Sequence, residues 1–295
     1  MDKPNVADHY NAEAANYFQQ YQRNNLRPDA EYPANYFRLQ ILVQRMAMLG
    51  VKSVYEVGVG EGTPLATMAG MGFRVAGCDI ADEMVKATQE TFKARSLSHF
   101  DISWGDVEDS NTLARQRAGG SFDAVMALGV LPHVKKDRMA IMNMSMMLRD
   151  GGHLFVEFRN KLFSLFTMNR YTKEFVLDDL LRDVDPAVKI SVSAELDRRL
   201  ATDLPPLRLQ TGNGAAPGYD AILSKFHNPF ELSELVESCG FKDIKIHWYH
   251  YHPAPPMLER DLGLAFRKAA MALEHEQSWR GYFLCSAGVL EATRK

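Results

Sequence analysis

The stretch Val54-Tyr55-Glu56-Val57-Gly58-Val59-Gly60-Glu61-Gly62-Thr63-Pro64 decides the fold of this chain, and a second run, Phe73-Arg74-Val75-Ala76-Gly77-Cys78-Asp79, completes it. The pattern predicts a strand, a glycine loop, a short helix and a second strand that ends in an acid. The three glycines let the backbone turn sharply and admit a ligand close to the main chain. Pro64 suits the first turn of a helix, and Asp79 can accept both hydroxyls of a ribose. Each feature alone is typical of a tight turn or a surface aspartate, but their order and spacing predict a nucleoside site.

Two positions of the loop narrow the identity of the nucleoside. A nicotinamide-dinucleotide loop needs G-x-G-x-x-G, so that a pyrophosphate can lie on the helix N-terminus. Here Thr63 occupies the last glycine position, and Glu56 places an anion where a pyrophosphate would be repelled. The pattern Glu-x-Gly-x-Gly-x-Gly resembles motif I of the class I S-adenosylmethionine (SAM)-dependent methyltransferases. SAM carries a sulfonium and an ammonium group and no phosphate, so the electrostatics agree with the resemblance.

The same resemblance implies further cofactor contacts. Ile80 and Met84 would flank the adenine, Asp106 would contact the adenine amino group, and the backbone amide of Val107 would lie at the ring. The residues also allow plain alternatives, in which Ile80 and Met84 are core residues and Asp106 is a helix cap or turn aspartate. The candidate cofactor-binding residues are Glu56, Gly58, Gly60, Gly62, Asp79, Ile80, Met84, Asp106, Val107 and Leu128.

Alternating strands and helices over residues 52–158 predict a doubly wound, Rossmann-like α/β sheet with right-handed crossovers. Asp150-Gly151-Gly152 predicts a turn before a fifth strand over 153–158. A final pair of strands is expected over 243–251 and 282–292, joined by a helix over 258–275. The resemblance implies that the terminal strand is antiparallel and lies at the edge of the sheet.

We expect four segments, in which an inserted cap interrupts the core and an N-terminal helical lid precedes it: 1–50 (lid), 51–158 (SAM-binding core), 159–228 (cap for the acceptor) and 229–295 (remainder of the core). The insertion contains an acidic helix over 174–185 and a loop rich in proline and glycine. It either builds the acceptor site or is a passive lid or oligomerisation element. The N-terminal aromatic residues likewise either cover the SAM site or pack on the domain.

The composition is that of an ordinary globular protein, with 295 residues, 46% apolar and 24% charged. A net charge of −3 gives no general nucleic-acid footprint. The three cysteines, at 78, 239 and 285, have no pairing or metal-ligand spacing, which favours reduced thiols in a cytoplasmic protein. We expect no membrane span and no signal peptide, because no apolar run approaches ~20 residues and the first residues are polar.

Methyl transfer requires the acceptor atom to be held in line with the methyl group, and some acceptors need a base. Histidines near the expected ligand edge of the sheet are the candidate bases: His133, His227 and His250. For His133 a structural role at the start of a helix is an alternative. The candidate acceptor-binding residues are Tyr10, Tyr17, Arg159, Arg170, Tyr249 and His252, with Lys161 as a further cation for a phosphate or carboxylate. On a strand, His250 and His252 would share one face, and Tyr249 and Tyr251 the other. No carboxylate or cysteine lies at ligand spacing from these histidines, so we expect no metal site.

The sequence leaves the acceptor open. The loop Leu128-Gly129-Val130-Leu131-Pro132-His133 lacks the (Asp/Asn/Ser)-Pro-Pro-(Tyr/Phe) motif of DNA amino-methyltransferases, and no Pro-Cys pair is present for cytosine-C5 chemistry. A small polar acceptor remains, such as a sugar or a secondary-metabolite scaffold, methylated on oxygen or nitrogen. Two other classes stay as alternatives: a SAM-binding regulatory protein without turnover, and an NAD(P)-dependent oxidoreductase. A homo-oligomer is possible.

Overall fold

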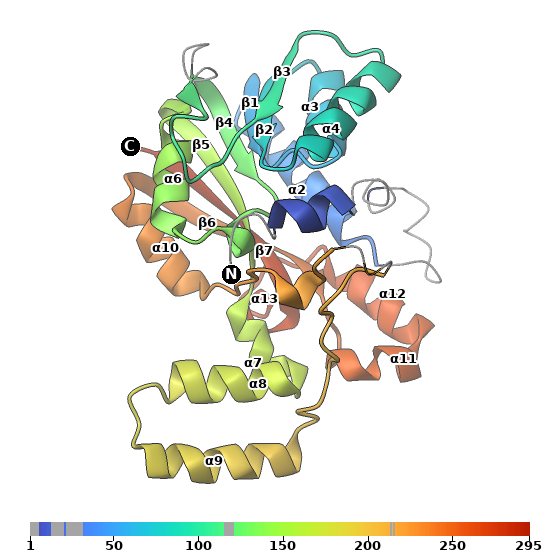
Figure 1. Ribbon diagram of the computed structural model, residues 1–295, viewed down its shortest axis with the longest axis vertical. Coiled ribbons are helices and arrows are strands. Elements are labelled where there is room, and N and C mark those ends of the chain that lie inside the picture. The colour runs from blue at the N-terminus through green and yellow to red at the C-terminus, as the bar shows by residue number, and fades with distance from the viewer. Residues whose placement is uncertain (1–5, 13–20, 22–31, 115–120, 213, 215) are drawn as a thin grey trace.

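The computed structural model describes residues 6–12, 21, 32–114, 121–212, 214 and 216–295, and one sheet lies at its centre (Figure 1). Within these residues the sheet has seven strands in the order β3-β2-β1-β4-β5-β7-β6. The strands are β1 (Ser53–Val57), β2 (Arg74–Asp79), β3 (Phe100–Trp104), β4 (Phe122–Ala127), β5 (Leu148–Arg159), β6 (Phe241–Tyr251) and β7 (Cys285–Arg294). The predicted doubly wound, Rossmann-like sheet is confirmed.

The first five strands pair in parallel, with β1 between β2 and β4. All five residues of β1 are buried, as the continuous apolar pattern requires of a strand covered on both faces. The C-terminal strand β7 is antiparallel to both of its neighbours, β5 and β6. The predicted antiparallel terminal strand is therefore present, but β7 lies between β5 and β6, and the edge of the sheet is β6.

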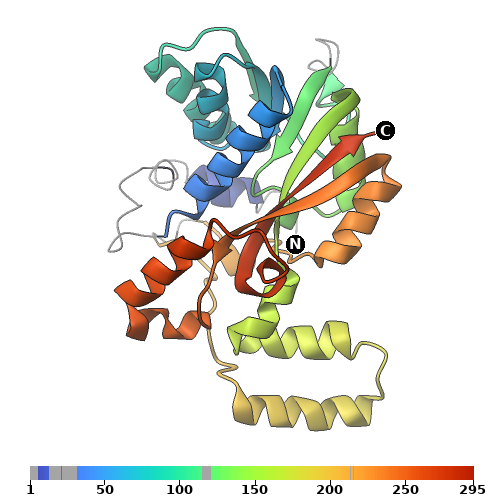
Figure 2. The ribbon, with the colours of Figure 1, turned by 180° about the vertical axis from the view of Figure 1, so that it is seen from behind.

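Helices cover both faces of the sheet (Figures 1 and 2). One face packs against α2 (Ala34–Met48), α3 (Thr63–Gly70) and α4 (Asp82–Ala94). The other face packs against α6 (Asp137–Ser145) and α10 (Pro229–Ser238). Three further helices lie in the connection from the end of β6 to the start of β7: α11 (Glu259–Leu262), α12 (Leu264–Leu273) and α13 (Gly281–Leu284). No helix of the described residues is long and apolar enough to cross a membrane.

The segment 159–228 projects from the carboxyl end of β5 as a helical arm (Figures 1 and 2). The arm leaves at Arg159 and returns beside it, because the His227 N–H donates to the Arg159 carbonyl at 2.8 Å. Its helices are the 3₁₀ turn η4 (Lys161–Phe163), α7 (Ser164–Thr167), α8 (Arg170–Glu174), the π-helix η5 (Phe175–Leu180), α9 (Pro186–Arg199) and the 3₁₀ turn η6 (Tyr219–Ala221).

Three local predictions were wrong. The acidic helix expected over 174–185 ends in the π-helix at Leu180, and the helix that follows, α9, was missed, although the Asp185 cap and Pro186 are its start signals. The turn expected at 150–152 lies inside β5, where the register with β4 shifts. The single helix expected over 258–275 is broken at Gly263, which has a φ of 48°.

Close backbone approach between β2 and the glycine loop gives a stability prediction. A Cβ on Gly77 would lie 2.6 Å from the Glu56 carbonyl oxygen and 2.5 Å from Val59 Cγ1. Since the carbonyl is fixed in β1, we expect Gly77→Ala to lower the free energy of unfolding by about 1–3 kcal/mol. Gly70→Ala is the matched control, because a Cβ there meets nothing within 4 Å. Urea unfolding of both variants measures the difference, and equal stabilities would contradict this account of Gly77.

Candidate active site

Three glycines of the loop between β1 and α3 adopt the left-handed backbone conformation. Gly58, Gly60 and Gly62 have φ values of 72°, 56° and 87°. The N–H groups of Gly58 and Val59 both donate to the Cys78 carbonyl, at 2.7 and 3.1 Å, which fixes the loop to the end of β2. A Cβ at Gly58 would lie 2.3 Å from Val130 Cγ2. The loop therefore needs glycine here for its conformation and for space.

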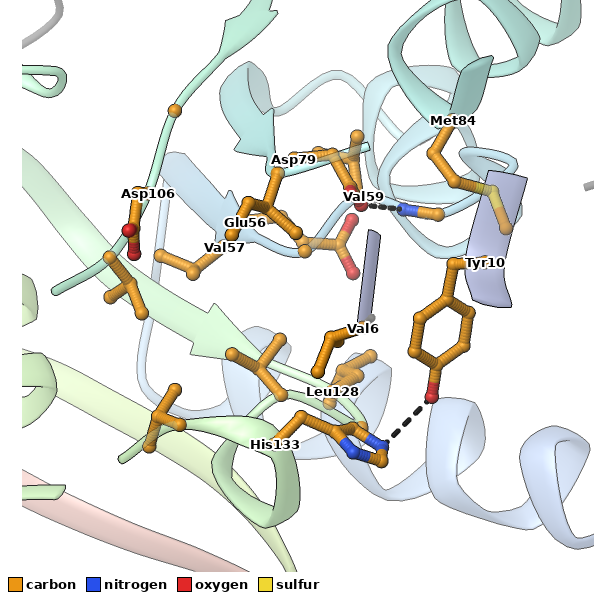
Figure 3. Close-up of a pocket in the computed structure, with 18 of the residues that line it drawn as sticks. Val6, Tyr10, Glu56, Val57, Val59, Asp79, Met84, Asp106, Leu128 and His133 are labelled. Carbon is orange, nitrogen blue, oxygen red and sulfur yellow. Dashed lines mark hydrogen bonds between the residues drawn. The ribbon is translucent and has the colours of Figure 1, made fainter. Parts of the chain in front are cut away.

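Asp79, at the end of β2, is a carboxylate that lies beside this loop. Its Oδ2 accepts the Gly60 N–H and its Oδ1 accepts the Ala81 N–H, both at 2.9 Å (Figure 3). Burial raises the pKa of Asp79 to about 6, and the backbone hydrogen bonds limit the rise because they favour the charged form. The side chain is thus held at the cavity wall with a carboxylate that persists at neutral pH.

Glu56 is a buried carboxylate at the wall of this cavity. It is 1% exposed, and its Oε2 has no hydrogen-bond donor among the described residues. Burial raises the pKa of Glu56 well above its usual range, and the charge of Arg38 opposes the rise. Glu61, by contrast, accepts hydrogen bonds from the backbone and hydroxyl of Thr63. An unpartnered carboxylate at a cavity wall fits a cationic ligand group and opposes a phosphate.

These side chains line one cavity at the carboxyl end of β1, β2 and β4 (Figure 3). Of the ten predicted cofactor-binding residues, the cavity brings together nine: Glu56, Gly58, Gly60, Asp79, Ile80, Met84, Asp106, Val107 and Leu128. Gly62 does not line it, because it lies against Thr88 of α4. Sequence reasoning did not find Val6, Val130 or Val134, which also line the cavity and are ordinary apolar residues with no local signal.

His133 is the one predicted catalytic histidine that lines this cavity among the described residues. Its Nδ1 lies 2.6 Å from the Leu223 carbonyl oxygen, which only accepts, so Nδ1 carries the hydrogen. Its Nε2 then accepts from the Tyr10 hydroxyl at 2.9 Å (Figure 3). Burial lowers the pKa of His133 to about 4, so the imidazole is neutral at neutral pH. Tyr10 lies on the helix 6–12, so the N-terminal segment and the arm meet on this ring.

The other predicted histidines lie outside the cavity lining. His227 Nε2 is 3.3 Å from Asp137 Oδ2. His250 stacks on Tyr32, with ring centroids 4.9 Å apart, and His252 packs against Phe163. Among the described residues, no group of histidine, cysteine and acidic side chains is arranged to hold a metal ion.

The expected two-faced arrangement on β6 is disturbed at His250, whose φ is +60°. Tyr249 and Tyr251, expected on one face, pack into two different core clusters, and both are buried. The Tyr249 hydroxyl donates to Glu157 at 2.6 Å, so this side chain is used inside the fold. The position of Tyr17 lies outside the described residues.

A buried network beside the cavity was not predicted. Arg38 of α2 donates to Glu157 at the end of β5, and also to the Tyr21 hydroxyl at 2.6 Å. Tyr21 lines the cavity. The available signal was Arg38 among the apolar positions of α2, because a buried cation in such a pattern needs an acidic partner.

Arg159 is a largely buried guanidinium next to the cavity wall. It lies over the ring of Tyr219, 4.3 Å from its centroid, and donates to the Ser224 hydroxyl at 2.7 Å. The same Tyr219 ring lies edge-on to His133, with centroids 5.9 Å apart. Burial lowers the pKa of Arg159. Among the described residues, no carboxylate forms an ion pair with Arg159, and Glu157 on the same strand is taken by Arg38 and Tyr249.

The other two predicted cations do not join Arg159. Lys161 pairs with Asp179 at 2.5 Å, and Arg170 lies 3.8 Å from both Glu174 and Asp220. The expectation that all three cations hold one anionic group is therefore not met by this arrangement. Arg159 alone keeps its charge available for a ligand.

Comparisons with known proteins agree with this geometry. Residues 55–156 match the family model described as a methyltransferase domain. The chain is 33% identical to glycine N-methyltransferase of Rattus norvegicus over 253 residues, which is 79% of this chain and 82% of the relative. It is 32% identical to a ubiquinone biosynthesis O-methyltransferase of Xanthomonas campestris pv. campestris over 142 residues, 48% of this chain and 57% of that protein. The crystal structure of magnesium protoporphyrin IX methyltransferase from Synechocystis PCC 6803 with bound SAH superposes with a TM-score of 0.54 at 16% identity and covers both chains fully, which is a likeness of fold.

The role of Asp79 can be tested through its charge. We expect Asp79→Asn to weaken SAM binding by about 1–3 kcal/mol, because a charged hydrogen-bond acceptor is lost. In the unaltered protein the affinity should fall as the pH drops through about 6, where the carboxylate takes up a proton. Titration calorimetry over that pH range measures both effects. Asp82→Asn, an exposed carboxylate outside the cavity lining, is the control, and an Asp79→Asn variant that binds as tightly as this control would overturn the assignment.

Proposed function

The chain belongs to the class I SAM-dependent methyltransferases, and within that family we propose that it methylates the nitrogen of a small amine that carries a carboxylate, such as an amino acid. Membership makes it an enzyme with SAM as methyl donor, so neither the oxidoreductase nor a binding protein without turnover is needed to explain the nucleoside site. The finer claim, the class of acceptor, rests on Arg159.

The cofactor cavity suits SAM by the chemistry of its walls. When bound, SAM supplies a methyl carbon on a sulfonium, with a neutral leaving group. Asp79 is placed to accept from ribose hydroxyls, and Asp106 and Val107 form the wall assigned to the adenine. Glu56 offers its unpartnered oxygen to a cationic group. We assign these roles on the fit between the side chains and the ligand.

The single observation that carries the acceptor class is the charge of Arg159, with which no carboxylate of the described residues forms an ion pair. A buried charge without a partner is costly, and the buried Arg38 and the half-buried Arg45 each meet a glutamate. Arg159 meets the Tyr219 ring and a hydroxyl instead. A ligand carboxylate would complete its surroundings with two parallel hydrogen bonds. An uncharged sugar hydroxyl would leave this charge uncompensated, which supports a carboxylate over the sugar expected from the sequence.

A nitrogen acceptor is supported by the similarity to an N-methyltransferase and by the Tyr10–His133 hydrogen bond, through which the acceptor can lose a proton. The rat relative, which overlaps 79% of this chain, is named for N-methylation of glycine. An amino group is protonated near neutral pH and has to lose a proton before it can attack. The Tyr10 oxygen can take that proton as its own hydrogen passes to His133 Nε2, while His133 Nδ1–H stays on the Leu223 carbonyl. His133 thus acts through Tyr10, and the arm holds the ring in the tautomer that this transfer needs.

The acceptor class is tested by removing the guanidinium. We expect Arg159→Met to lower kcat/KM for glycine about 10- to 100-fold, because a charged hydrogen bond to the carboxylate is lost. SAM affinity should stay unchanged. Arg208→Met is the matched control, since Arg208 lies on the same Tyr219 ring but already pairs with Asp220 at 3.2 Å. Methyl transfer should be followed for glycine, for larger amino acids and for amines without a carboxylate. Equal rates with and without the carboxylate would sink the proposal.

The proton path is tested by three histidine variants and one tyrosine variant. We expect Tyr10→Phe and His133→Ala to lower the single-turnover rate about 10²-fold, the lower range of general acid–base catalysis. His227→Ala and His250→Ala should keep the rate, because these rings do not line the cavity. Since the pKa of His133 is lowered to about 4, its neutral form persists as the pH falls from neutrality to about 4. An apparent pKa near 6.5 that disappears in His133→Ala would contradict this picture.

A further inference from the structure

The helix α9 lies at the outer end of the arm, far from the sheet (Figures 1 and 2). None of its 14 described residues is buried. A single helix of this length is marginal in water on its own, so it needs packing on at least one face. The packing visible within the chain comes from one side only, where α8 and the π-helix lie.

The inner side of α9 makes that contact. Lys189, Val192, Leu196 and Leu200 are half-buried and recur at helical spacing on one face. Asp197 adds an ion pair with Lys173 of α8, at 2.6 Å. The helix therefore has a defined inner face, and the opposite face is presented to solvent.

The outer face has a shape that suits a second helix. Ala187, Ser191 and Ala194 form a ridge of small side chains. Ile190 and Val188 flank this ridge on its two sides, with 70% and 50% of their surface exposed. Small residues between two branched apolar side chains permit close approach at the 8–10 Å spacing of packed helices. Further exposed leucines of the arm lie before and after α9 in the chain: Leu180, Leu207 and Leu209.

The charges of α9 that are left on its outer side differ in sign between its two ends, because Lys189 lies on the inner face and Asp197 pairs with Lys173. Asp183 and Asp185 lie just before its first residue, Pro186. Arg198 and Arg199 stand at its end, where both meet the one carboxylate of Glu195, so a positive charge is left over. Two copies of the helix packed antiparallel place the acidic start of each against the basic end of the other. A parallel pair would place like charges together.

We propose that α9 is the interface through which two copies of this chain pair, as antiparallel helices about a twofold axis near Ile190 and Ser191. An isologous contact of this kind uses the same face of both copies. The position of the axis follows from the charges, because Asp183 lies as many positions before Ile190 as Arg198 lies after Ser191. The chain after α9 supplies Tyr219 and the Leu223 carbonyl to the wall near His133, so pairing would brace the acceptor side of the site. The inference is independent of the acceptor class.

Analytical ultracentrifugation of the full chain tests the interface. We expect the unaltered protein to dimerise and Ile190→Glu to raise the dimer dissociation constant at least tenfold. Met48→Glu is the matched control, because Met48 of α2 is 75% exposed and lies outside the arm. Circular dichroism and SAM binding show that each variant is folded. A monomeric unaltered protein overturns the proposal, and so does an oligomer that Ile190→Glu leaves intact or that Met48→Glu weakens equally.

The antiparallel arrangement is tested by exchanging charges. Asp183→Arg and Arg198→Glu each bring like charges together across the twofold axis, so each variant alone should dimerise less than the unaltered protein. Mixed together, the two variants should form a heterodimer, because both charge pairs are then opposite. Native mass spectrometry resolves the heterodimer from the homodimers. A statistical mixture, or no dimer on mixing, would overturn the antiparallel pairing.

Discussion

The attachment of the glycine loop to the end of β2 is the constraint on which the site depends. One carbonyl, that of Cys78, receives two loop N–H groups, and the Asp79 carboxylate receives a third. The bonds require left-handed glycines in the loop and the absence of a side chain at Gly77. Together they bring the end of β1, which carries Glu56, against the end of β2. The carboxylates of Glu56 and Asp79 therefore line the same cavity, because these hydrogen bonds fix the backbone between them.

The parts of the fold that could be predicted are those whose signals are local. Gly58, Gly60, Asp79 and the strands around them follow from spacing within some 25 residues. The contacts that complete the cavity join residues over 100 positions apart, as Tyr10 joins His133 and Arg38 joins Glu157. No periodic pattern connects such pairs, because each side chain has an ordinary local explanation. Tyr249 and Tyr251 were misplaced for another reason: the alternation rule fails where His250 takes a positive φ, although the rings of His250 and His252 lie together as predicted, with centroids 4.8 Å apart.

The buried ionic groups of this protein are of two kinds: those that pair with each other within the fold, and those that could pair with a ligand. Glu157 holds Arg38 and Tyr249, and Glu291 holds Arg45 and His247, so these charges are consumed within the fold. Glu56 and Arg159 are different, because among the described residues the first has an oxygen with no hydrogen-bond donor and the second has no carboxylate partner. Glu56 lines the cofactor cavity, Arg159 lies next to its wall, and the proposed acceptor class rests on the second of these groups.

Two segments outside the sheet are fastened to the same imidazole. Tyr10 approaches His133 from the N-terminal helix 6–12, and Leu223 approaches it from the arm. Val6 and Tyr10 also line the cavity that Glu56 and Asp79 line. A spent cofactor that departs past this side has to break the Tyr10–His133 hydrogen bond and lift the helix. For a product that leaves on this side, we expect the opening of this cover to set the residence time, so that product release can compete with chemistry as the slowest event in the cycle.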